Sequence, residues 1–147
     1  MDNSEPVLVP LDVHECLRRL GTRHLGRLAV VVNRQPLVFP VNYAMDGREV
    51  VFRTGAGTKL IGANGQRVAF EIDGADPLYH EGWSVMAVGR AVEECDAARI
   101  RELERLPLAP WCPGSKAHWM RIETSAITGR RIARLPTVVR EMTTNDD

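Results

Sequence analysis

Most of the chain consists of short apolar runs, rich in β-branched residues, that are separated by turn-forming residues. Runs of this length and composition are typical of β-strands. The pattern predicts strands over residues 25–32, 37–44, 50–52, 67–73, 83–94, 118–123 and 127–132. Because most connections are short, we expect these six or seven strands to pair antiparallel and form a barrel, not a parallel sheet.

Glycines and turn residues mark where the predicted strands reverse or bend. Asp46-Gly47 predicts a tight hairpin between the strands on either side of it, and residues 33–35 predict a second turn. Gly89 lies inside the long strand 83–94 and indicates a bulge or a close backbone approach. Residues 74–82 are predicted to form a polar loop, and residues 107–114 a proline-rich irregular loop.

Two short helices are expected between the strands. Asp12 can cap the first, with Glu15 three residues later, and Gly21 suits its end. Its apolar residues fall on one face at helical spacing: Val13, Cys16, Leu17 and Leu20. Asp96 can cap a second helix over residues 97–106, and residues 60–64 can form a helical turn or two.

The length of 147 residues suits one domain, which we place at residues 11–135. Residues 1–10 are predicted to be a flexible arm with a short extended piece at residues 7–9. Residues 136–147 are predicted to be a frayed polar tail. The acidic N-terminus lacks the basic region and following apolar run that are typical of a signal peptide.

Composition excludes several classes of function. Lys plus Arg and Asp plus Glu both number 19, so nothing indicates a polybasic nucleic-acid or membrane surface. The apolar runs fall far short of the roughly 20 residues of a membrane span. Three widely spaced cysteines and four scattered histidines suggest neither a disulfide framework nor a metal site, so we expect a cytoplasmic protein without a metal.

One cluster carries recognisable chemistry. Residues 53–59 gather two cations, two hydroxyls and two glycines: Arg53, Thr54, Gly55, Gly57, Thr58 and Lys59. Such a segment can hold a phosphate, because glycine lets the backbone approach and the side chains supply charge and hydrogen bonds. The spacing is not that of a P-loop. An ordinary solvated turn would have the same composition, so both interpretations stay open at this point.

The order of several short motifs resembles the pyridoxamine-5′-phosphate-oxidase-like family of flavin-binding split barrels, in particular its small actinobacterial branch related to nitroimidazole-resistance proteins. The resemblance covers residues 11–132. It rests on Gly26-Arg27-Leu28-Ala29, Pro40-Val41-Asn42-Tyr43, Phe52-Arg53-Thr54 with Gly57-Thr58-Lys59-Leu60, Val68-Ala69-Phe70, Trp83-Ser84-Val85 with Gly89-Arg90-Ala91, and Trp119 with Ile127-Thr128-Gly129-Arg130.

The resemblance implies an antiparallel split β-barrel with helices at its rim, forming a homodimer with flavin mononucleotide (FMN) at the subunit interface. The backbone of Val41, Asn42 and Tyr43 would run beside the isoalloxazine ring. The phosphate and ribityl chain would meet Arg53, Thr54, Thr58 and Lys59, with Phe52 in the same set. Trp83 and Ser84 would lie near the same cofactor, and Trp111 would reach it from the partner subunit. Some relatives bind a deazaflavin or haem instead.

The function implied is an oxidoreductase that transfers hydride or electrons to or from a small organic substrate. No catalytic side chain is assigned, because the cofactor of such an enzyme carries the redox chemistry. Two alternatives remain, a non-catalytic flavin-binding protein for storage, sensing or regulation, and a barrel that has lost its cofactor. The tail at residues 136–147 lacks the substrate-phosphate segment of full-length pyridoxamine-5′-phosphate oxidases, so vitamin B6 oxidation is not expected.

Overall fold

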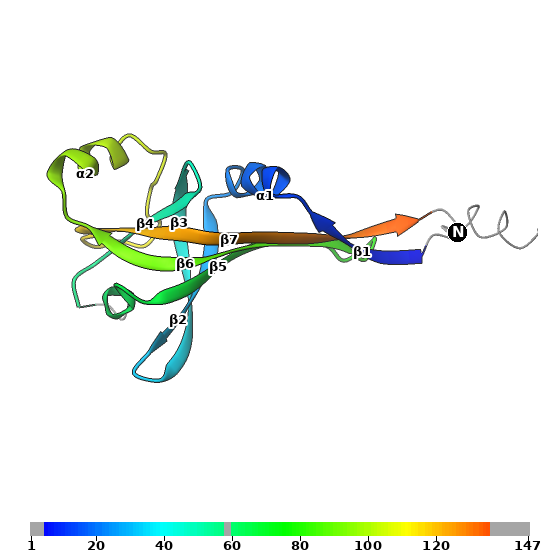
Figure 1. Cartoon of the computed structure of the whole chain (residues 1–147), viewed down its shortest axis with the longest axis horizontal. Coiled ribbons are helices and arrows are strands. Elements are labelled where there is room, and N and C mark those ends of the chain that lie inside the picture. Colours follow the sequence, from blue (N-terminus) through cyan, green and yellow to red (C-terminus); the bar gives the residue numbers. More distant parts are fainter. Residues whose placement is uncertain (1–4, 58–59, 136–147) are drawn as a thin grey trace, which may run out of the picture.

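The computed structural model describes residues 5–57 and 60–135, in an elongated arrangement of strands with two short α-helices (Figure 1). The elements in order are β1 (Glu5–Leu11), α1 (Val13–Leu20), β2 (Leu25–Val32), β3 (Gln35–Asp46), β4 (Glu49–Thr54), the 3-10 turn η1 (Ile61–Ala63), β5 (Arg67–Asp76), β6 (Glu81–Glu94), α2 (Ala97–Leu103) and β7 (His118–Leu135). No helix in the described ranges has the length and apolar character needed to cross a membrane.

Six strands close into a ring. Their order is β7-β4-β3-β2-β5-β6, and β6 pairs back onto β7. Every pairing is antiparallel. β1 lies outside the ring, where it pairs with the second half of β7, and the two strands project from the body together (Figure 1). The antiparallel split barrel expected from the sequence is therefore confirmed.

The core fills the ring with the inward side chains of alternating strand positions. In β2, Leu28 and Val30 point inward and are buried, while Ala29 between them is exposed. Tyr43 packs edge-on against Phe70, with ring centroids 4.6 Å apart. A second, smaller cluster lies beneath α2 and consists of Val51, Leu103 and Trp119 with partly buried neighbours. α2 thus covers strands β4 and β7.

Both predicted helix caps are present. The Glu15 N–H donates to the Asp12 carboxylate at 2.7 Å, and the Ala98 N–H donates to Asp96 at 3.2 Å. Gly21 follows α1 as its C-cap. α2 ends at Leu103, three residues earlier than predicted, because the chain continues as turns with hydrogen bonds three residues apart.

Two polar or terminal stretches differ from the prediction. Residues 5–10 of the expected flexible arm belong to β1, because they pair with β7. The expected loop at residues 74–82 is mostly a hairpin, since β5 continues to Asp76 and β6 starts at Glu81. Backbone pairing satisfies the polar groups of these residues whatever their side chains are. The predicted tail at residues 136–147 lies outside the described residues.

Gly89 forms the bulge that the sequence indicates. The register between β6 and β7 shifts between Val88 and Gly89. A Cβ atom on Gly89 would lie 2.1 Å from the carbonyl oxygen of Glu123, and 2.8 Å from the Cα of Thr124. The two backbones therefore approach here more closely than any other residue would allow.

Replacement of this glycine should destabilise the ring. We expect Gly89→Ala to lower the free energy of unfolding by roughly 1–3 kcal/mol, because the clash is with backbone atoms that cannot rotate away. Gly21→Ala is the matched control, since its Cβ would meet nothing closer than 3.5 Å. Urea unfolding of both variants measures the difference, and equal stabilities would contradict the close approach.

Candidate functional site

The predicted phosphate-binding strand end opens onto a cavity of about 260 Å³. The cavity lies where β3 and β4 separate, because their pairing ends at Tyr43 and Phe52 while β3 continues alongside β2. Its lining residues come from β3, β4, the approach to η1 and the loop before β7: Phe39, Pro40, Val41, Asn42, Arg53, Thr54, Leu60, Pro110, Cys112 and Lys116. The cavity therefore brings together four of the predicted site residues: Val41, Asn42, Arg53 and Thr54.

Arg53 is fixed in this cavity by two contacts. Its guanidinium carbon lies 4.6 Å from the centre of the Trp119 ring, and its Nε donates to the Lys116 carbonyl oxygen at 3.0 Å. A guanidinium carries five N–H donors, and those on the terminal nitrogens have no acceptor among the described residues. The Arg53 guanidinium is therefore fixed in position and can still donate hydrogen bonds to a ligand.

Asn42 connects β3 to the loop that covers it. Its amide nitrogen donates to the His24 carbonyl at 3.2 Å, and its Oδ1 accepts from the Trp111 N–H at 2.8 Å. The side chain is thus engaged in holding the protein together. Asn42 can contribute to a cofactor site chiefly through its backbone, as the family resemblance implied.

A second cavity, of about 430 Å³, adjoins the first at Asn42. Its other lining residues are His24, Tyr43, Leu106, Pro107, Leu108, Ala109 and Trp111. Trp111 remains 68% exposed, so most of its indole is available to another molecule. The loop between α2 and β7 therefore forms a wall of both cavities.

Tyr43 and Phe52 have their side chains in the core rather than in a cofactor site. Tyr43 is 1% exposed, and its hydroxyl donates to the Leu20 carbonyl at 2.5 Å. Burial raises the pKa of this hydroxyl. Phe52 is fully buried. Any contact of these two residues with a cofactor is made by their backbones or at the cavity edge.

Trp83 and Ser84 lie on a different part of the ring. Trp83 is contacted by the guanidinium groups of Arg19 and Arg23, which lie 4.7 and 5.2 Å from its ring centre. Ser84 lines another cavity, of about 490 Å³, whose lining residues include none of those around the first cavity. A single subunit does not bring Trp83 and Ser84 to Arg53.

Glu71 is the titratable group with the most perturbed environment in that other cavity. Its Oε1 is buried without a hydrogen-bond partner among the described residues, because the Arg27 nitrogen is 3.7 Å away. Burial, followed by the neighbouring Asp73, raises the pKa of Glu71 to about 7. The folded state therefore binds this proton more tightly than the unfolded state does. As a result, the free energy of unfolding falls as the pH rises from about 4.5 through 7.

Two predicted residues, Thr58 and Lys59, lie outside the described residues, so their part in the site stays a prediction. Lys116, which lines the same cavity as Arg53, was not predicted from the sequence. Lys116 sits in an irregular loop 63 residues after Arg53, and no local pattern links the two. The pairing of β4 with β7 brings the end of that loop to the cavity.

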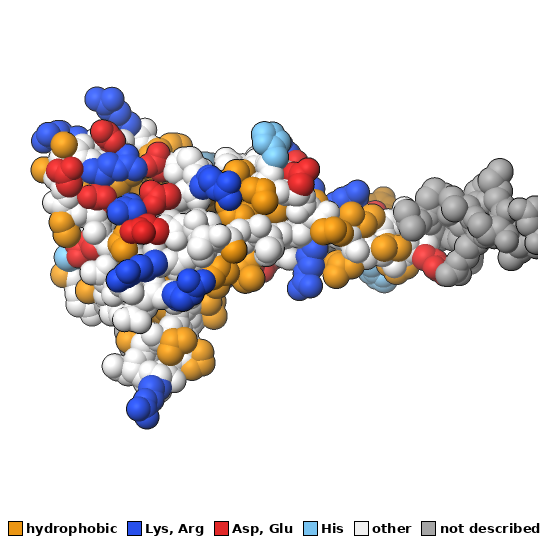
Figure 2. Space-filling model, in the orientation of Figure 1, with side chains coloured by type: hydrophobic (Ala, Val, Ile, Leu, Met, Phe, Trp, Pro, Cys, Tyr) orange, Lys and Arg blue, Asp and Glu red, His pale blue; other side chains and the backbone are white. Residues whose placement is uncertain are grey.

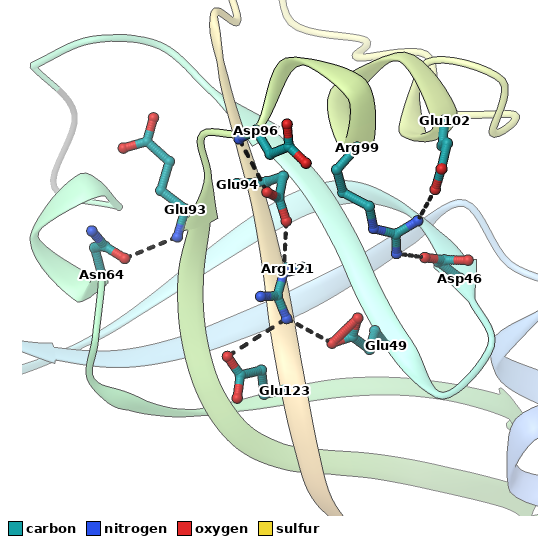
Figure 3. A network of polar contacts seen from close by, with 10 residues as sticks. All are labelled: Asp46, Glu49, Asn64, Glu93, Glu94, Asp96, Arg99, Glu102, Arg121 and Glu123. Atoms are coloured by element: carbon teal, nitrogen blue, oxygen red, sulfur yellow. Dashed lines mark hydrogen bonds and ion pairs between the residues drawn. The ribbon is translucent and has the colours of Figure 1, made fainter.

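A network of charges holds α2, and with it the covering loop, against the ring (Figure 3). Arg121 of β7 contacts Glu49 at 3.0 Å, Glu94 at 3.1 Å and Glu123 at 3.5 Å. Arg99 of α2 pairs with Glu102 and with Asp46 at the end of β3. The ends of the loop at residues 104–117 are therefore anchored by α2 on one side and by β7 on the other.

No group of three His, Cys, Asp or Glu side chains in residues 5–57 and 60–135 is arranged to hold a metal ion. The nearest pairing of this kind is His118 with Glu93, at 2.6 Å between Nδ1 and Oε2. A histidine–glutamate pair between β7 and β6 has an ordinary structural role as an interstrand contact.

Comparison with known proteins decides the family. The sequence profile of the pyridoxamine 5′-phosphate oxidase family matches residues 12–131. The chain belongs to this family. The uncharacterized protein Rv0080 of Mycobacterium tuberculosis is 35% identical to it over 132 residues, which is 85% of this chain and 86% of the relative.

Solved structures share this fold. The FAD binding protein from Mycobacterium smegmatis is 39% identical and superposes with a TM-score of 0.73 over 83% of this chain and 98% of that one. A 5-nitroimidazole antibiotic resistance protein from Bacteroides thetaiotaomicron superposes with a TM-score of 0.70, over 88% of this chain and 90% of that one. At 12% identity, the second likeness concerns the fold alone.

In this member of the pyridoxamine 5′-phosphate oxidase family, the Tyr43 side chain should matter for stability and not for ligand binding. We expect Tyr43→Phe to lower the free energy of unfolding by roughly 0.5–1.5 kcal/mol, because it removes the hydrogen bond to Leu20. Affinity for a flavin should stay within about twofold, because the hydroxyl faces the core. Urea unfolding and flavin titration separate the two effects, and lost affinity at unchanged stability would place the hydroxyl in the site.

Proposed function

We propose that this chain binds a flavin nucleotide in the cavity between β3, β4 and the loop at residues 104–117, and uses it in oxidation or reduction of a small organic substrate. The observation that carries the proposal is Arg53, a fixed cation with donors facing a cavity whose other walls are largely apolar. The 39% identity to an FAD binding protein supports the choice of a flavin.

The donors around the cavity fit the phosphate end of such a cofactor. Arg53 can donate from its terminal nitrogens, and Lys116 adds a second positive charge. Thr54 also lines the cavity, next to Arg53 in β4. Charge-assisted hydrogen bonds of this kind are the strongest that a phosphate can accept from a protein. Thr58 and Lys59 follow directly in the sequence, and we propose that they add to this set.

The rest of the cavity fits a flat ring. Phe39, Val41 and Leu60 give apolar walls. Residues 39–42 of β3 have passed the end of the β4 pairing, so their backbone on that side is not committed to a strand ladder among the described residues. Backbone N–H and C=O groups in that position can hydrogen-bond the polar edge of an isoalloxazine ring.

When bound, a flavin supplies a reversible acceptor for a hydride at N5 or for single electrons. The residues of this chain bind it, orient it and cover it. Arg53 and Lys116 fix one end, the β3 backbone fixes the ring, and the loop carrying Pro110 and Trp111 shields that side from water. No proton transfer is assigned to a side chain.

We also propose a homodimer with the cofactor at its interface. The outer face of β2, β3 and β6 exposes apolar side chains that include Leu25, Val31, Val38 and Met86. Figure 2 shows hydrophobic side chains gathered on the projecting hairpin of β2 and β3 and along the extension of β1 and β7. Exposed apolar side chains gathered in this way are typical of an interface.

The dimer gives a role to the residues that one subunit leaves far from the cavity. Trp83 and Ser84 lie beyond reach of Arg53 within one chain, on a surface with cavities of its own. A second copy packed on the outer face could bring its Trp83 and Ser84 to the first copy's flavin. Trp111, which is largely exposed, could reach the flavin of the other subunit in the same manner.

The first test is the absorption spectrum of the purified protein, with mass spectrometry of whatever denaturation releases. A flavin spectrum with released FMN or FAD supports the proposal, and FMN is the cofactor that the family resemblance implies. Release of a deazaflavin or haem would show that this molecule, and not a flavin, is the cofactor. A colourless protein that takes up neither flavin would overturn it. Activity with a reduced nicotinamide and nitro or quinone acceptors separates an enzyme from a non-catalytic flavin protein.

Arg53→Ala should weaken FMN binding by roughly ten- to a hundredfold, because a charge-assisted hydrogen bond is worth about 1.5–3 kcal/mol. Riboflavin, which lacks the phosphate, should lose much less. Titration of both flavins gives the comparison, and equal losses would show that Arg53 does not bind the phosphate.

Arg53→Lys is the matched control. It keeps a positive charge but cannot reproduce the guanidinium fork. Its FMN affinity should fall between those of the wild type and Arg53→Ala. Thermal unfolding of both variants checks that the loss of the Trp119 contact has not disturbed the fold.

The dimer should depend on the outer face. Val38 is 66% exposed in the single chain, so Val38→Asp costs little there but buries a charge in the proposed interface. We expect this variant to sediment as a monomer at micromolar concentration while the wild type sediments as a dimer. Val13→Asp, on α1 and away from the β2–β3 hairpin, is the control and should stay dimeric (Figure 1). A dimeric Val38→Asp protein would move the interface elsewhere.

A further inference from the structure

A row of side chains that includes two charges crosses the outer face of the ring. Arg27 on β2 pairs with Glu71 on β5, and Glu71 pairs with Met86 on β6. Residues directly opposite one another on neighbouring strands lie on the same face of a sheet. Met86 is 40% exposed, so Glu71 lies with it on the outer face.

The apolar surface proposed as the dimer interface begins two residues away from this row. Ala29 pairs with Val38 on β3 and with Ala69 on β5. These three residues line an apolar cavity of about 340 Å³ on the outer face. A standard interface covers about 800 Å² of each partner, so an interface centred on Val38 extends over Glu71.

The carboxylates in this part of the face outnumber the arginine that contacts them. An Arg27 nitrogen lies 3.4 Å from an oxygen of Asp73 and 3.7 Å from Oε1 of Glu71. That Oε1 is buried and has no hydrogen-bond partner among the described residues. One guanidinium therefore faces two carboxyl groups, and a single proton on the pair makes the three groups electrically neutral.

The other charges near Glu71 come from β7. Arg130 lines both cavities that Glu71 lines, and Arg131 lines one of them. In the strand register, Ser84 of β6 lies between Asp73 and Arg130. Within residues 5–57 and 60–135, neither β7 arginine forms an ion pair with either carboxyl group, and β6 adds no charged side chain to these cavities.

We propose that two copies of the chain associate through this face with one proton held on each Glu71–Asp73 pair, so that the dimer weakens as the pH rises. This inference rests on the dimer of the proposed function. Association removes water from the Glu71 side chain, which is 37% exposed in the single chain. Because burial favours the neutral form of a carboxyl group, each copy takes up a proton as it joins the dimer and returns it to solvent on separation.

The single chain already holds this proton close to neutral pH. Burial, and then the Asp73 carboxylate, raise the pKa of Glu71 to about 7. Further burial in the dimer raises the pKa above that value. Association is therefore at full strength below about pH 7 and weakens as the pH rises through the pKa in the dimer.

The test is the dissociation constant of the full-length chain, measured by sedimentation at constant ionic strength. Two protons are linked to each dimer, so the dissociation constant should rise by roughly ten- to a hundredfold between about pH 6 and about pH 8. Glu71→Gln keeps the shape of the side chain and removes the titration. Its dissociation constant should match that of the wild type at the lower pH and stay within about twofold across the range.

Asp73→Asn tests the shared arginine. With one carboxylate left, Arg27 can pair with an ionised Glu71, so the proton is no longer needed for neutrality. We expect the dissociation of this variant at higher pH to be much weaker than that of the wild type. A wild-type pH dependence in Asp73→Asn would overturn the role of the pair.

Glu102→Gln is the matched control. Glu102 is an exposed glutamate on α2, which packs on β4 and β7 and lines neither cavity of Glu71. This variant should keep the pH dependence of the wild type. If Glu71→Gln also keeps it, another group titrates and the inference is wrong. A dissociation constant that falls as the pH rises would show that an arginine of the other copy neutralises Glu71, which would also overturn the inference.

Failure of this inference is distinguishable from failure of the proposed function. A wild-type dimer whose dissociation constant does not change with pH leaves the dimer standing and removes the proton. A wild-type monomer at both pH values overturns the proposed dimer and this inference together. Flavin content, measured on the same samples, tests cofactor binding separately, because Glu71 does not line the cavity of Arg53.

Discussion

The pairing of β6 with β7 closes the ring, and the geometry of the candidate site depends on it. β7 begins at His118, where it pairs with β4, so Trp119 lies against Arg53 and fixes the cation. The same strand is held to β6 over nearly its whole length, with one bulge at Gly89 that adjusts the register. A change in this pairing would move Trp119, whose ring is one of the two described contacts that orient Arg53.

The loop at residues 104–117 is the second element on which the site depends. It has no regular structure, yet it is tied to the ring at both ends and at its middle. α2 packs on Val51 and Trp119 and is pinned by Arg99, while the N–H of Trp111 is bound by Asn42. An irregular segment with this many anchors can supply shaped walls that a regular strand cannot, which is the usual division of labour between scaffold and binding loops.

The strands and helix caps were predictable because their signals are local. β-branched runs, Asp12 and Asp96 each act through their immediate neighbours. The predicted bounds were wrong where strand pairing continued beyond the expected strand, as at residues 74–76 and in β1. The cluster at Arg53 was found from its composition, whereas Lys116 and the tether made by Asn42 depend on contacts between residues more than 60 positions apart. The burial of Tyr43 could have been predicted from strand alternation alone.

The three tryptophans occupy three distinct electronic environments. Trp111 is surrounded largely by solvent, Trp83 is flanked by two guanidinium groups, and Trp119 is buried beneath one. Indole fluorescence responds to polarity and to nearby positive charge, so the emission of this protein is a sum of separable components. A water-soluble quencher should reach the Trp111 component first and the Trp119 component last. Tryptophan fluorescence can therefore report separately on the loop at residues 104–117, on β6 at Trp83 and on the surroundings of Arg53.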